Sequence, residues 1–246
     1  MPIHGVKSKL RTTYKWALKA LRVKSVRIAG IRLPVSRSFA PAMRKRLHAG
    51  RYEASEIALL RRHLAPSDRV LEFGAGLGFL ASACAKIVGS DSVVTVEANP
   101  DMHPYIHDTF RLNRVAPNLI CAAVGAADGT SVLHINDNFW STSTRCRPGV
   151  VRTIEVETIS FASLVERVSP TFLIIDIEGA EIDLVSSPIA DSVRCILIEV
   201  HKQLIGDDAI ESVCNWLMQS GFHKVDAVAD ESTLFWRRPV DHPHSH

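Results

Sequence analysis

The stretch VLEFGAGLGFLA, residues 70–81, joins an apolar strand to three glycines on alternate positions and then to a helix of small residues. In a doubly wound α/β sheet, ligands bind beyond the carboxyl ends of the strands, so the turn after the first strand must let its backbone approach the ligand. Gly74, Gly76 and Gly78 suit that approach, although a strand-to-helix turn without a ligand also favours glycine. The stretch predicts a nucleotide-binding turn, and the rest of the chain must identify the nucleotide.

Strands and helices alternate after this turn. The expected strands are 69–73, 92–97, 118–124, 171–176, 194–200, 222–228 and 232–237, and the expected helices are 78–88, 101–113, 161–168, 179–186 and 207–220. Continuous apolar runs such as TFLII (171–175) are typical of strands that are covered on both faces. The pattern predicts the α/β class, with a doubly wound, mostly parallel, seven-stranded sheet.

Further segments complete the expected fold. Residues 131–135 and 151–157 alternate apolar and polar side chains, which predicts an inserted hairpin. Residues 23–35 alternate apolar and basic side chains and predict an edge hairpin or short strands, and residues 41–64 read as helical.

The composition fits a globular protein, with 46% hydrophobic and 22% charged residues. No apolar run approaches the roughly 18 residues that would span a membrane, and the N-terminus lacks an export signal. The five cysteines are odd in number and widely spaced, which predicts reduced thiols and neither a disulfide framework nor a zinc site. We therefore expect a cytoplasmic protein.

Charge is distributed unevenly, because the residues before Glu53 carry 14 of the 29 lysines and arginines and no acidic residue. Residues 1–22 would form an amphipathic helix that binds an anionic membrane surface, a nucleic acid, an acidic partner or the acidic remainder of its own chain. An organelle-targeting peptide is a further reading. We expect three parts: this basic N-terminal extension, a single domain (23–240) and a His-rich tail (241–246). The extension would make the protein peripheral at the inner membrane surface, and the sequence leaves the oligomeric state open.

The glycine spacing distinguishes two cofactors. Dinucleotide-binding turns read G-x-G-x-x-G, whereas this chain has G-x-G-x-G with Glu72 two positions before the first glycine. That arrangement is similar to motif I of class I S-adenosylmethionine-dependent methyltransferases. Glu97 ends the next strand, where a carboxylate can accept hydrogen bonds from both ribose hydroxyls. NAD also contains ribose, so Glu97 supports an adenosyl ligand without excluding a dinucleotide.

Titratable side chains follow two later strands. LIIDIEGAE (173–181) places Asp176 and Glu178 after a buried strand, and ILIEVH (196–201) places Glu199 and His201 at the end of the next strand. In the usual winding the first of these strands borders the glycine-turn strand, so the four groups would meet at one rim. Burial and mutual repulsion there would shift their pKa values.

Six segments in order resemble the FkbM-like methyltransferases. They are GRYEASEIALL (50–60), VLEFGAGLGFLA (70–81), VVTVEANP (93–100), AAVGAADGTSVLHI (122–135), LIIDIEGAE (173–181) and ILIEVH (196–201). The resemblance covers roughly residues 23 to 235. It implies a class I methyltransferase domain that transfers a methyl group from S-adenosylmethionine, generally to an oxygen of a sugar or small natural product. One departure is Glu72, where the family more often has aspartate.

The resemblance also implies a set of cofactor-binding residues. These are Tyr52, Glu53, Glu72, Gly74, Ala75, Gly76, Gly78, Glu97, Ala98, Ala126 and Asp128. The glycine turn would face the methionine portion, Glu97 the ribose, and the segment at Ala126 and Asp128 the adenine. Glu72 would order the turn or reach the ligand's amino group through water, or it would only cap the turn. Asp128 equally fits a tight turn, and Tyr52 with Glu53 would close over the cofactor or simply begin a helix.

Methyl transfer to an alcohol needs a group that takes the hydroxyl proton. The candidates are, in order, Asp176, His201, Glu178 and Glu199, although a histidine in such a place is often structural. The same oxygen-rich cluster could instead bind a divalent cation such as Mg²⁺, which lowers the pKa of the acceptor. Residues 136–149 (NDNFWSTSTRCRPG) would form a lid over the acceptor or a plain surface loop.

Three other functions compete with this interpretation. An NAD-dependent oxidoreductase is disfavoured by the glycine spacing and by the lack of a Tyr-x-x-x-Lys pair. A nucleic-acid-modifying methyltransferase is favoured by the basic N-terminus, but base methyltransferases generally show Asn- or Asp-Pro-Pro-aromatic where this chain has Asp-Ile-Glu-Gly. A binding module without catalysis is weakened by the intact turn and acidic rim. We expect a small-molecule hydroxyl acceptor as the partner.

Overall fold

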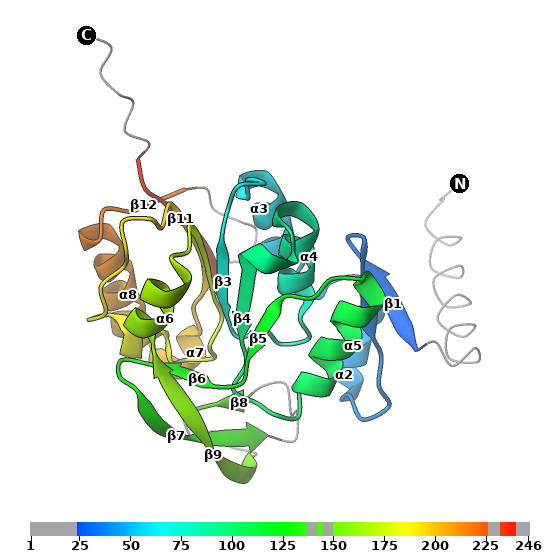
Figure 1. The fold of residues 1–246 in the computed structure, drawn as a ribbon. Coiled ribbons are helices and arrows are strands. Elements are labelled where there is room, and N and C mark those ends of the chain that lie inside the picture. Colours follow the sequence, from blue (N-terminus) through cyan, green and yellow to red (C-terminus); the bar gives the residue numbers. More distant parts are fainter. Residues whose placement is uncertain (1–23, 137–141, 145–149, 226–231, 240–246) are drawn as a thin grey trace, which may run out of the picture.

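The fold is described from a computed structural model, which covers residues 24–136, 142–144, 150–225 and 232–239. Its main sheet has seven strands in the order β12-β13-β11-β10-β3-β4-β5 (Figure 1). They are β3 (Val70–Phe73), β4 (Val93–Val96), β5 (Asn118–Ile120), β10 (Phe172–Ile175), β11 (Cys195–Glu199), β12 (His223–Lys224) and β13 (Thr233–Arg237). Pairing is parallel from β11 through β5, and β13 is antiparallel to both of its neighbours. The predicted mostly parallel, seven-stranded sheet is confirmed.

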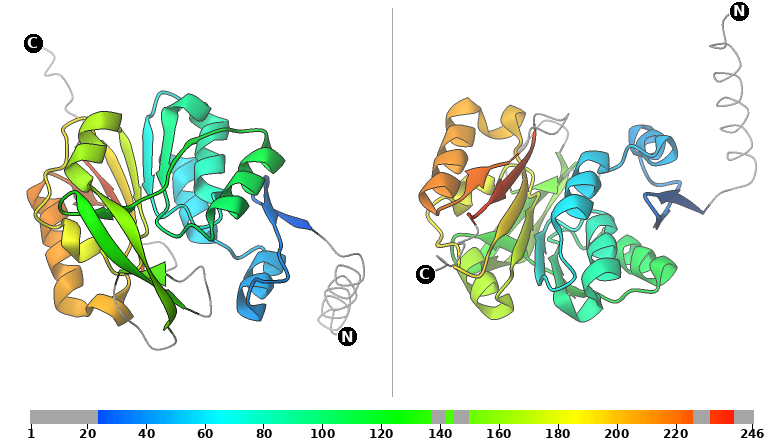
Figure 2. Two further views of the ribbon diagram at one scale, coloured as in Figure 1. Left: turned by 60° about the horizontal axis from the view of Figure 1, so that its bottom comes forward. Right: turned by 90° about the horizontal axis from the view of Figure 1, so that it is seen from above.

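Helices cover both faces of this sheet (Figure 2). One face packs on α3 (Ala54–His63), α4 (Phe79–Val88) and α5 (His103–Asn113), and the other packs on α6 (Phe161–Val168), the 3-10 helix η2 (Glu181–Leu184) and α8 (Asp207–Gln219). The side chains of strand β10 alternate between the two faces of the sheet, which explains its continuously apolar sequence. Phe172 and Ile174 pack in the core on the side of α3, α4 and α5, and Leu173 and Ile175 pack in the core on the side of α6, η2 and α8. All four side chains are buried, as a doubly wound sheet requires.

The strand order reverses between β3 and β10. From β3 the chain moves outward to β4 and β5, and it later returns to β10 on the other side of β3. Gly74 follows β3 with a φ of 90°, and a Cβ placed on it would lie 1.8 Å from the backbone oxygen of Asp176. Only glycine lets the turns after β3 and β10 approach so closely, and this switch point is where such sheets bind ligands.

A second sheet lies across the carboxyl ends of the first, at the bottom of Figure 1. Its order is β6 (Ala123–Gly125), β9 (Val150–Ser160), β7 (Gly129–Asn136) and β8 (Thr142–Ser143). The antiparallel pair β7–β9 confirms the inserted hairpin expected from residues 131–135 and 151–157. The Ser143 hydroxyl donates to the backbone oxygen of Glu178 at 2.6 Å, so this sheet is tied to the turn after β10.

Some expected elements differ from those observed. The strand expected at 118–124 is broken at Cys121 into β5 and β6, which join different sheets. The helical region 41–64 is two helices, α2 (Pro41–Ala49) and α3, because Gly50 ends the first in a left-handed conformation. The helix expected at 179–186 is only η2, since Glu178 and Gly179 both have positive φ values. A short helix, α7 (Lys202–Ile205), was not expected.

The N-terminal part of the described chain is a hairpin, as expected, formed by β1 (Ser25–Ile28) and β2 (Ile31–Pro34). It is fixed to α5, whose Asn113 side chain accepts from the Arg32 N–H and donates to the Arg32 oxygen. The extension 1–22, the tail 241–246 and most of the expected lid, including Phe139, Trp140, Arg145 and Arg147, lie outside the described residues.

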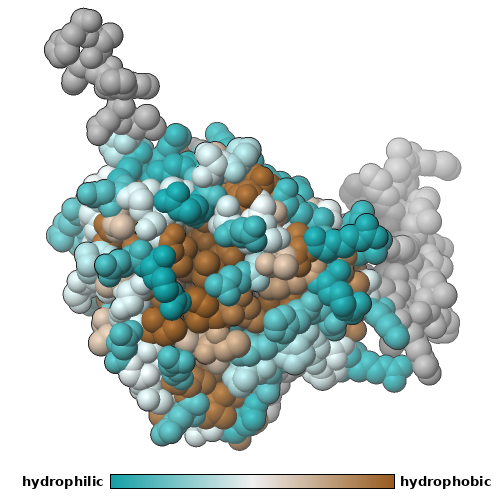
Figure 3. All heavy atoms as spheres, viewed as in Figure 1, coloured by the Kyte–Doolittle hydropathy of each residue, from teal (hydrophilic) through white to brown (hydrophobic). Residues whose placement is uncertain are grey.

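Within the part of the chain that the structure describes, apolar side chains pack in two cores, and some also reach the surface. In the middle of the face seen in Figure 1, apolar atoms gather where strands β3 to β5 meet α6 (Figure 3). Val94 and Ile120 are only partly buried on that side of the sheet. Among the described residues, no helix is long and apolar enough to cross a bilayer, and Cys84, Cys121, Cys195 and Cys214 are free thiols.

Candidate active site

A cavity of about 430 Å³ opens at the carboxyl ends of β3, β4, β10 and β11. Its size falls within the roughly 300–1,000 Å³ that is usual for small-molecule sites. The start of α3 and the second sheet complete its walls. Ten of the predicted site residues line it: Tyr52, Glu53, Gly74, Gly76, Glu97, Ala98, Asp176, Glu178, Glu199 and His201. The structure thus brings most of the predicted cofactor-binding residues and all of the predicted catalytic residues to one place.

Tyr52 and Glu53 lie over the glycine turn. A Cβ on Gly76, whose φ is 54°, would lie 2.8 Å from the Tyr52 hydroxyl and 3.6 Å from Oε1 of Glu53. Burial raises the pKa of Tyr52, and the adjacent Glu53 carboxylate raises it further. Glu53 and Glu178 both have left-handed backbone conformations, which cost a non-glycine residue about 1–2 kcal/mol. Such strain is concentrated at functional sites, and both residues face the cavity.

Glu97 is held rigidly beside this turn. Its carboxylate accepts hydrogen bonds from the backbone N–H of Gly76 at 3.0 Å and of Asn99 at 2.8 Å. Burial raises the pKa of Glu97 to about 7, although the two N–H donors act in the opposite direction. A carboxylate has about four acceptor positions, so the bonded side chain keeps positions for ligand hydroxyls.

Glu72 lies behind the turn and not in the cavity. It is 1% exposed, and its carboxylate accepts a hydrogen bond from the Thr95 hydroxyl on the neighbouring strand. Burial, with a smaller contribution from Glu97, raises the pKa of Glu72 to about 8. Glu72 is therefore bonded to the neighbouring strand and does not line the cavity, and its expected role in ordering the turn stays a prediction.

Four other predicted cofactor residues do not line the cavity. Ala75 is buried within the turn, and Gly78 begins α4, where a Cβ would meet Phe110 and Ile106 at 3.0 and 3.1 Å. Ala126 and Asp128 are exposed, and Asp128 accepts a hydrogen bond from the Ser160 N–H. The residues at the expected adenine position are instead Ala122, Ala123 and Val124, because the chain leaves the sheet earlier than the expected strand.

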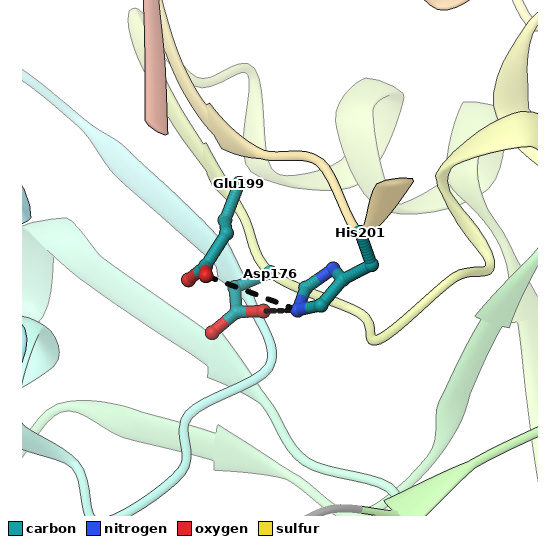
Figure 4. A group of neighbouring side chains, drawn as sticks. All are labelled: Asp176, Glu199 and His201. Carbon is teal, nitrogen blue, oxygen red and sulfur yellow. Dashed lines mark ion pairs between the residues drawn. The ribbon is translucent and has the colours of Figure 1, made fainter. Parts of the chain in front are cut away.

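The acidic rim surrounds one histidine. His201 is 12% exposed, and its Nε2 lies 3.6 Å from Oδ1 of Asp176, 3.5 Å from Oε2 of Glu178 and 3.9 Å from Oε1 of Glu199. Figure 4 shows Asp176, Glu199 and His201 converging from the ends of neighbouring strands. On the other side of the ring, Nδ1 is 2.9 Å from Oε1 of Glu181. The imidazole therefore has a carboxylate at each nitrogen.

These contacts decide the charge of the cluster. Burial lowers the pKa of His201, but the hydrogen bond to Glu181 and the charges of Asp176 and Glu178 raise it more, to about 9. Burial raises the pKa of Asp176, the negative charge of Glu199 adds to that effect, and His201 opposes it. At neutral pH the His201 ring is therefore protonated and does not act as the base in the free protein.

Several residues in or next to the site were missing from the predicted set, and three of them carry charge that bears on its chemistry. Glu181 is completely buried and pairs with His201, and its only signal was its position in LIIDIEGAE. Arg46 and Arg51 line the cavity as exposed cations, whereas the sequence showed them only as part of the basic N-terminal region.

The family model described as the Methyltransferase FkbM domain matches residues 72–227, which is more than half of the chain. The chain belongs to the FkbM family of class I methyltransferases. S-adenosylmethionine is accordingly the cofactor of this FkbM methyltransferase. The matched region contains the glycine turn, Glu97 and the whole acidic rim, whereas Tyr52 and Glu53 precede it.

Similarity to individual proteins is more distant. The FkbM methyltransferase is 35% identical to the ribosomal protein L11 methyltransferase of Thermus thermophilus over 80 residues, which are 32% of this chain and 31% of that protein. Its fold is similar to a methyltransferase from Pyrococcus furiosus, with a TM-score of 0.49 and 12% identity over 95% of this chain and 99% of that chain. A magnesium protoporphyrin IX methyltransferase from Synechocystis PCC 6803 has a TM-score of 0.47 and 14% identity, over 81% and 85% of the two chains.

The cavity of the FkbM methyltransferase has features that fit its cofactor. At Gly76 the Tyr52 hydroxyl takes the direction that a Cβ would occupy, so glycine lets Tyr52 pack directly over the turn. The Glu97 carboxylate would accept from ribose hydroxyls, and Ala122 to Val124 offer an apolar wall for the adenine. The chemistry that the cofactor supplies is an electrophilic methyl group.

Proposed function

We propose that the protein methylates a hydroxyl oxygen of a small acceptor, a sugar or a natural-product-like molecule. The observation that carries the proposal is the acidic rim of Asp176, Glu178 and Glu199 beside the glycine turn, in one cavity. An alcohol is a poor nucleophile until it loses its proton, and a positioned carboxylate promotes that loss. A rim of carboxylates opposite the predicted cofactor residues is the arrangement that this reaction needs.

The protein's part in the reaction is to hold two molecules and accept one proton. The bond from the methyl carbon to sulfur breaks as the bond to the acceptor oxygen forms, and the hydroxyl proton passes to a rim carboxylate. Asp176 leads the candidates, because its backbone packs against Gly74 and its raised pKa makes its ionised form a stronger base. Orientation of the two reactants supplies much of the rate.

The polar walls support a hydroxyl-rich acceptor. Ser143 and Thr144 of the second sheet line the cavity together with Gln203, and these side chains suit hydrogen bonds to hydroxyl groups. Arg46 and Arg51 at the same cavity suit an acceptor that also carries a carboxylate or phosphate.

Calorimetric titration of the full chain with S-adenosylmethionine and with NAD tests the cofactor first. Micromolar binding of S-adenosylmethionine and no binding of NAD is the expected result. Transfer from tritium-labelled cofactor to a panel of sugars and hydroxylated natural products, with RNA in parallel, then tests the acceptor. Labelling that depends on Asp176 and survives Asp128→Asn, outside the cavity, supports the proposal; labelling of RNA alone, or on nitrogen, overturns it.

A further inference from the structure

Three side chains of metal-ligating type meet where β10 and β11 end. In the parallel register Ile175 pairs with Ile198, so Asp176 and Glu199, each the next residue, lie side by side. His201 follows two residues later and points to the same place (Figure 4). One ligand atom from each of the three lies within 4.8 Å of the other two.

The distances between these atoms suit an ion better than direct hydrogen bonds. Nε2 of His201 is 3.6 Å from Oδ1 of Asp176 and 3.9 Å from Oε1 of Glu199, whereas N–H···O bonds measure about 2.7–3.2 Å. A cation with bonds of about 2.1 Å holds neighbouring ligand atoms about 3 Å apart and opposite ones about 4.2 Å apart. The two separations from Nε2 lie within that interval, and all three ligand atoms lie within 4.8 Å of one another.

Asp176 gives an independent indication of a ligand. Its side chain is 35% exposed, but its Oδ1 atom is buried and has no hydrogen-bond partner among the described residues. Buried carboxylate oxygens are rarely left without a partner, because desolvation of the charge is costly. The same atom is the one that faces Nε2 of His201.

Glu181 orients the histidine for a ligand role. It is completely buried, and its Oε1 accepts from Nδ1 of His201 at 2.9 Å and from the Gly179 N–H at 3.2 Å. A carboxylate behind Nδ1 fixes the ring and directs Nε2 forward, as in carboxylate–histidine–metal sites. Nε2 is then directed at the gap between Asp176 and Glu199.

We propose that Asp176, Glu199 and His201 bind one divalent cation of the Mg²⁺ and Mn²⁺ class. Carboxylate oxygens suit both ions, and the imidazole favours Mn²⁺. When the cation binds, it replaces the Nε2 proton of His201, which passes to solvent. All three ligands face the cavity, so the open coordination positions face the acceptor. The cation orients a hydroxyl and lowers its pKa, and Glu178, 3.5 Å from Nε2, accepts the proton in place of Asp176, which is then a ligand. This catalytic role rests on the proposed function, whereas the binding site stands on the geometry alone.

Manganese binding to the full chain tests the site directly. Protein freed of metal with a chelator is titrated with MnCl₂, and free Mn²⁺ is followed by electron paramagnetic resonance. We expect one site per chain, lost in both Asp176→Asn and Glu199→Gln, and unchanged in Glu155→Gln, an exposed acid on β9. Glu181→Gln, which changes only the orienting partner, should weaken binding about 10- to 100-fold.

Binding of S-adenosylmethionine is measured on the same samples, so that Mn²⁺ binding can be compared with cofactor binding. Circular dichroism confirms that each variant is folded. Absence of a stoichiometric site, or equal binding by wild type and both ligand variants, overturns the metal proposal. If S-adenosylmethionine still binds and methyl transfer persists in chelator, only the metal proposal falls; if Mn²⁺ binds but no hydroxyl is methylated, only the proposed function falls.

Discussion

The two halves of the cavity satisfy their carboxylates in different ways. On the β3–β4 side, Glu97 accepts hydrogen bonds from two backbone N–H groups, and Glu72, behind the cavity, accepts one from the Thr95 hydroxyl. On the β10–β11 side, Glu199 accepts from the Ser232 hydroxyl at 3.5 Å. Asp176 and Glu199 face His201 across gaps of 3.6 and 3.9 Å, and Oδ1 of Asp176 has no hydrogen-bond partner among the described residues. The first half holds its carboxylates by short hydrogen bonds, whereas the second half keeps an acceptor atom of Asp176 unbonded.

The largest effect is expected where the two halves touch. Gly74→Ala would place a Cβ 1.8 Å from the backbone oxygen of Asp176, at a φ of 90° that alanine rarely adopts. Because neither backbone can move without its strand, we expect a loss of about 4 kcal/mol or more in the free energy of unfolding, measured by urea denaturation. Gly129→Ala is the control, since no atom lies within 4 Å of its added Cβ. Equal stability of the two variants would contradict the close contact.

Removal of a charge from the second half should separate catalysis from cofactor binding. Asp176→Asn is expected to lower the rate of methyl transfer about 100- to 10,000-fold, because the rim loses its leading base or ligand. Affinity for S-adenosylmethionine should change little, since Glu97 and the glycine turn remain. Single-turnover rates and calorimetry measure the two quantities. A parallel loss of both would mean that the halves are not independent.

A substitution on the β3–β4 side of the cavity should instead lower the affinity for the cofactor. Glu97→Gln removes the charge that would accept from ribose, and we expect affinity to fall about 10- to 100-fold. The carboxylate is the accepting form and its pKa is about 7, so wild-type affinity should decrease as the pH falls below that value and level off above it. Calorimetry at about pH 6 and about pH 8 checks this. A variant with the wild-type pH dependence would remove Glu97 from the ribose position.

The last prediction concerns stability and the carboxylate behind the turn. Folding raises the pKa of Glu72 from 4.5 to about 8, so the folded state holds this proton longer than the unfolded state. Its contribution to stability is full below pH 4.5 and falls as the pH rises to about 8. Glu72→Gln should match wild type in mild acid and exceed it in mild alkali, as shown by thermal unfolding. If the difference in stability between the two proteins did not change with pH, Glu72 would be charged in the folded protein.

The sequence predicted the parts of the site that depend on strand ends. Parallel strands end at a common edge, so the convergence of Asp176, Glu199 and His201 followed from their positions after apolar runs. The switch between β3 and β10 followed from the order of motifs. Both predictions needed only local pattern and the rules of strand winding.

The sequence could not predict what depends on tertiary packing. The break at Cys121 sends the chain into a second sheet and moves the cavity wall from Ala126 to Ala122. Glu181 became a partner of His201 only because Glu178 and Gly179 take positive φ values and shorten the following helix to η2. The raised pKa of His201 depends on these contacts and not on its place in the chain.

The short strand β8 connects the second sheet to the acceptor side of the cavity. Through Ser143 it is bonded to the turn that carries Glu178, and Leu133, Ser143 and Thr144 face the cavity from this sheet. The glycine turn and Glu97 follow strands of the main sheet, and within the described ranges no hydrogen bond joins their side chains to the second sheet. Substitutions in the insertion can therefore reshape the acceptor pocket while the cofactor half keeps its geometry, and a designer who wanted a different acceptor would begin there.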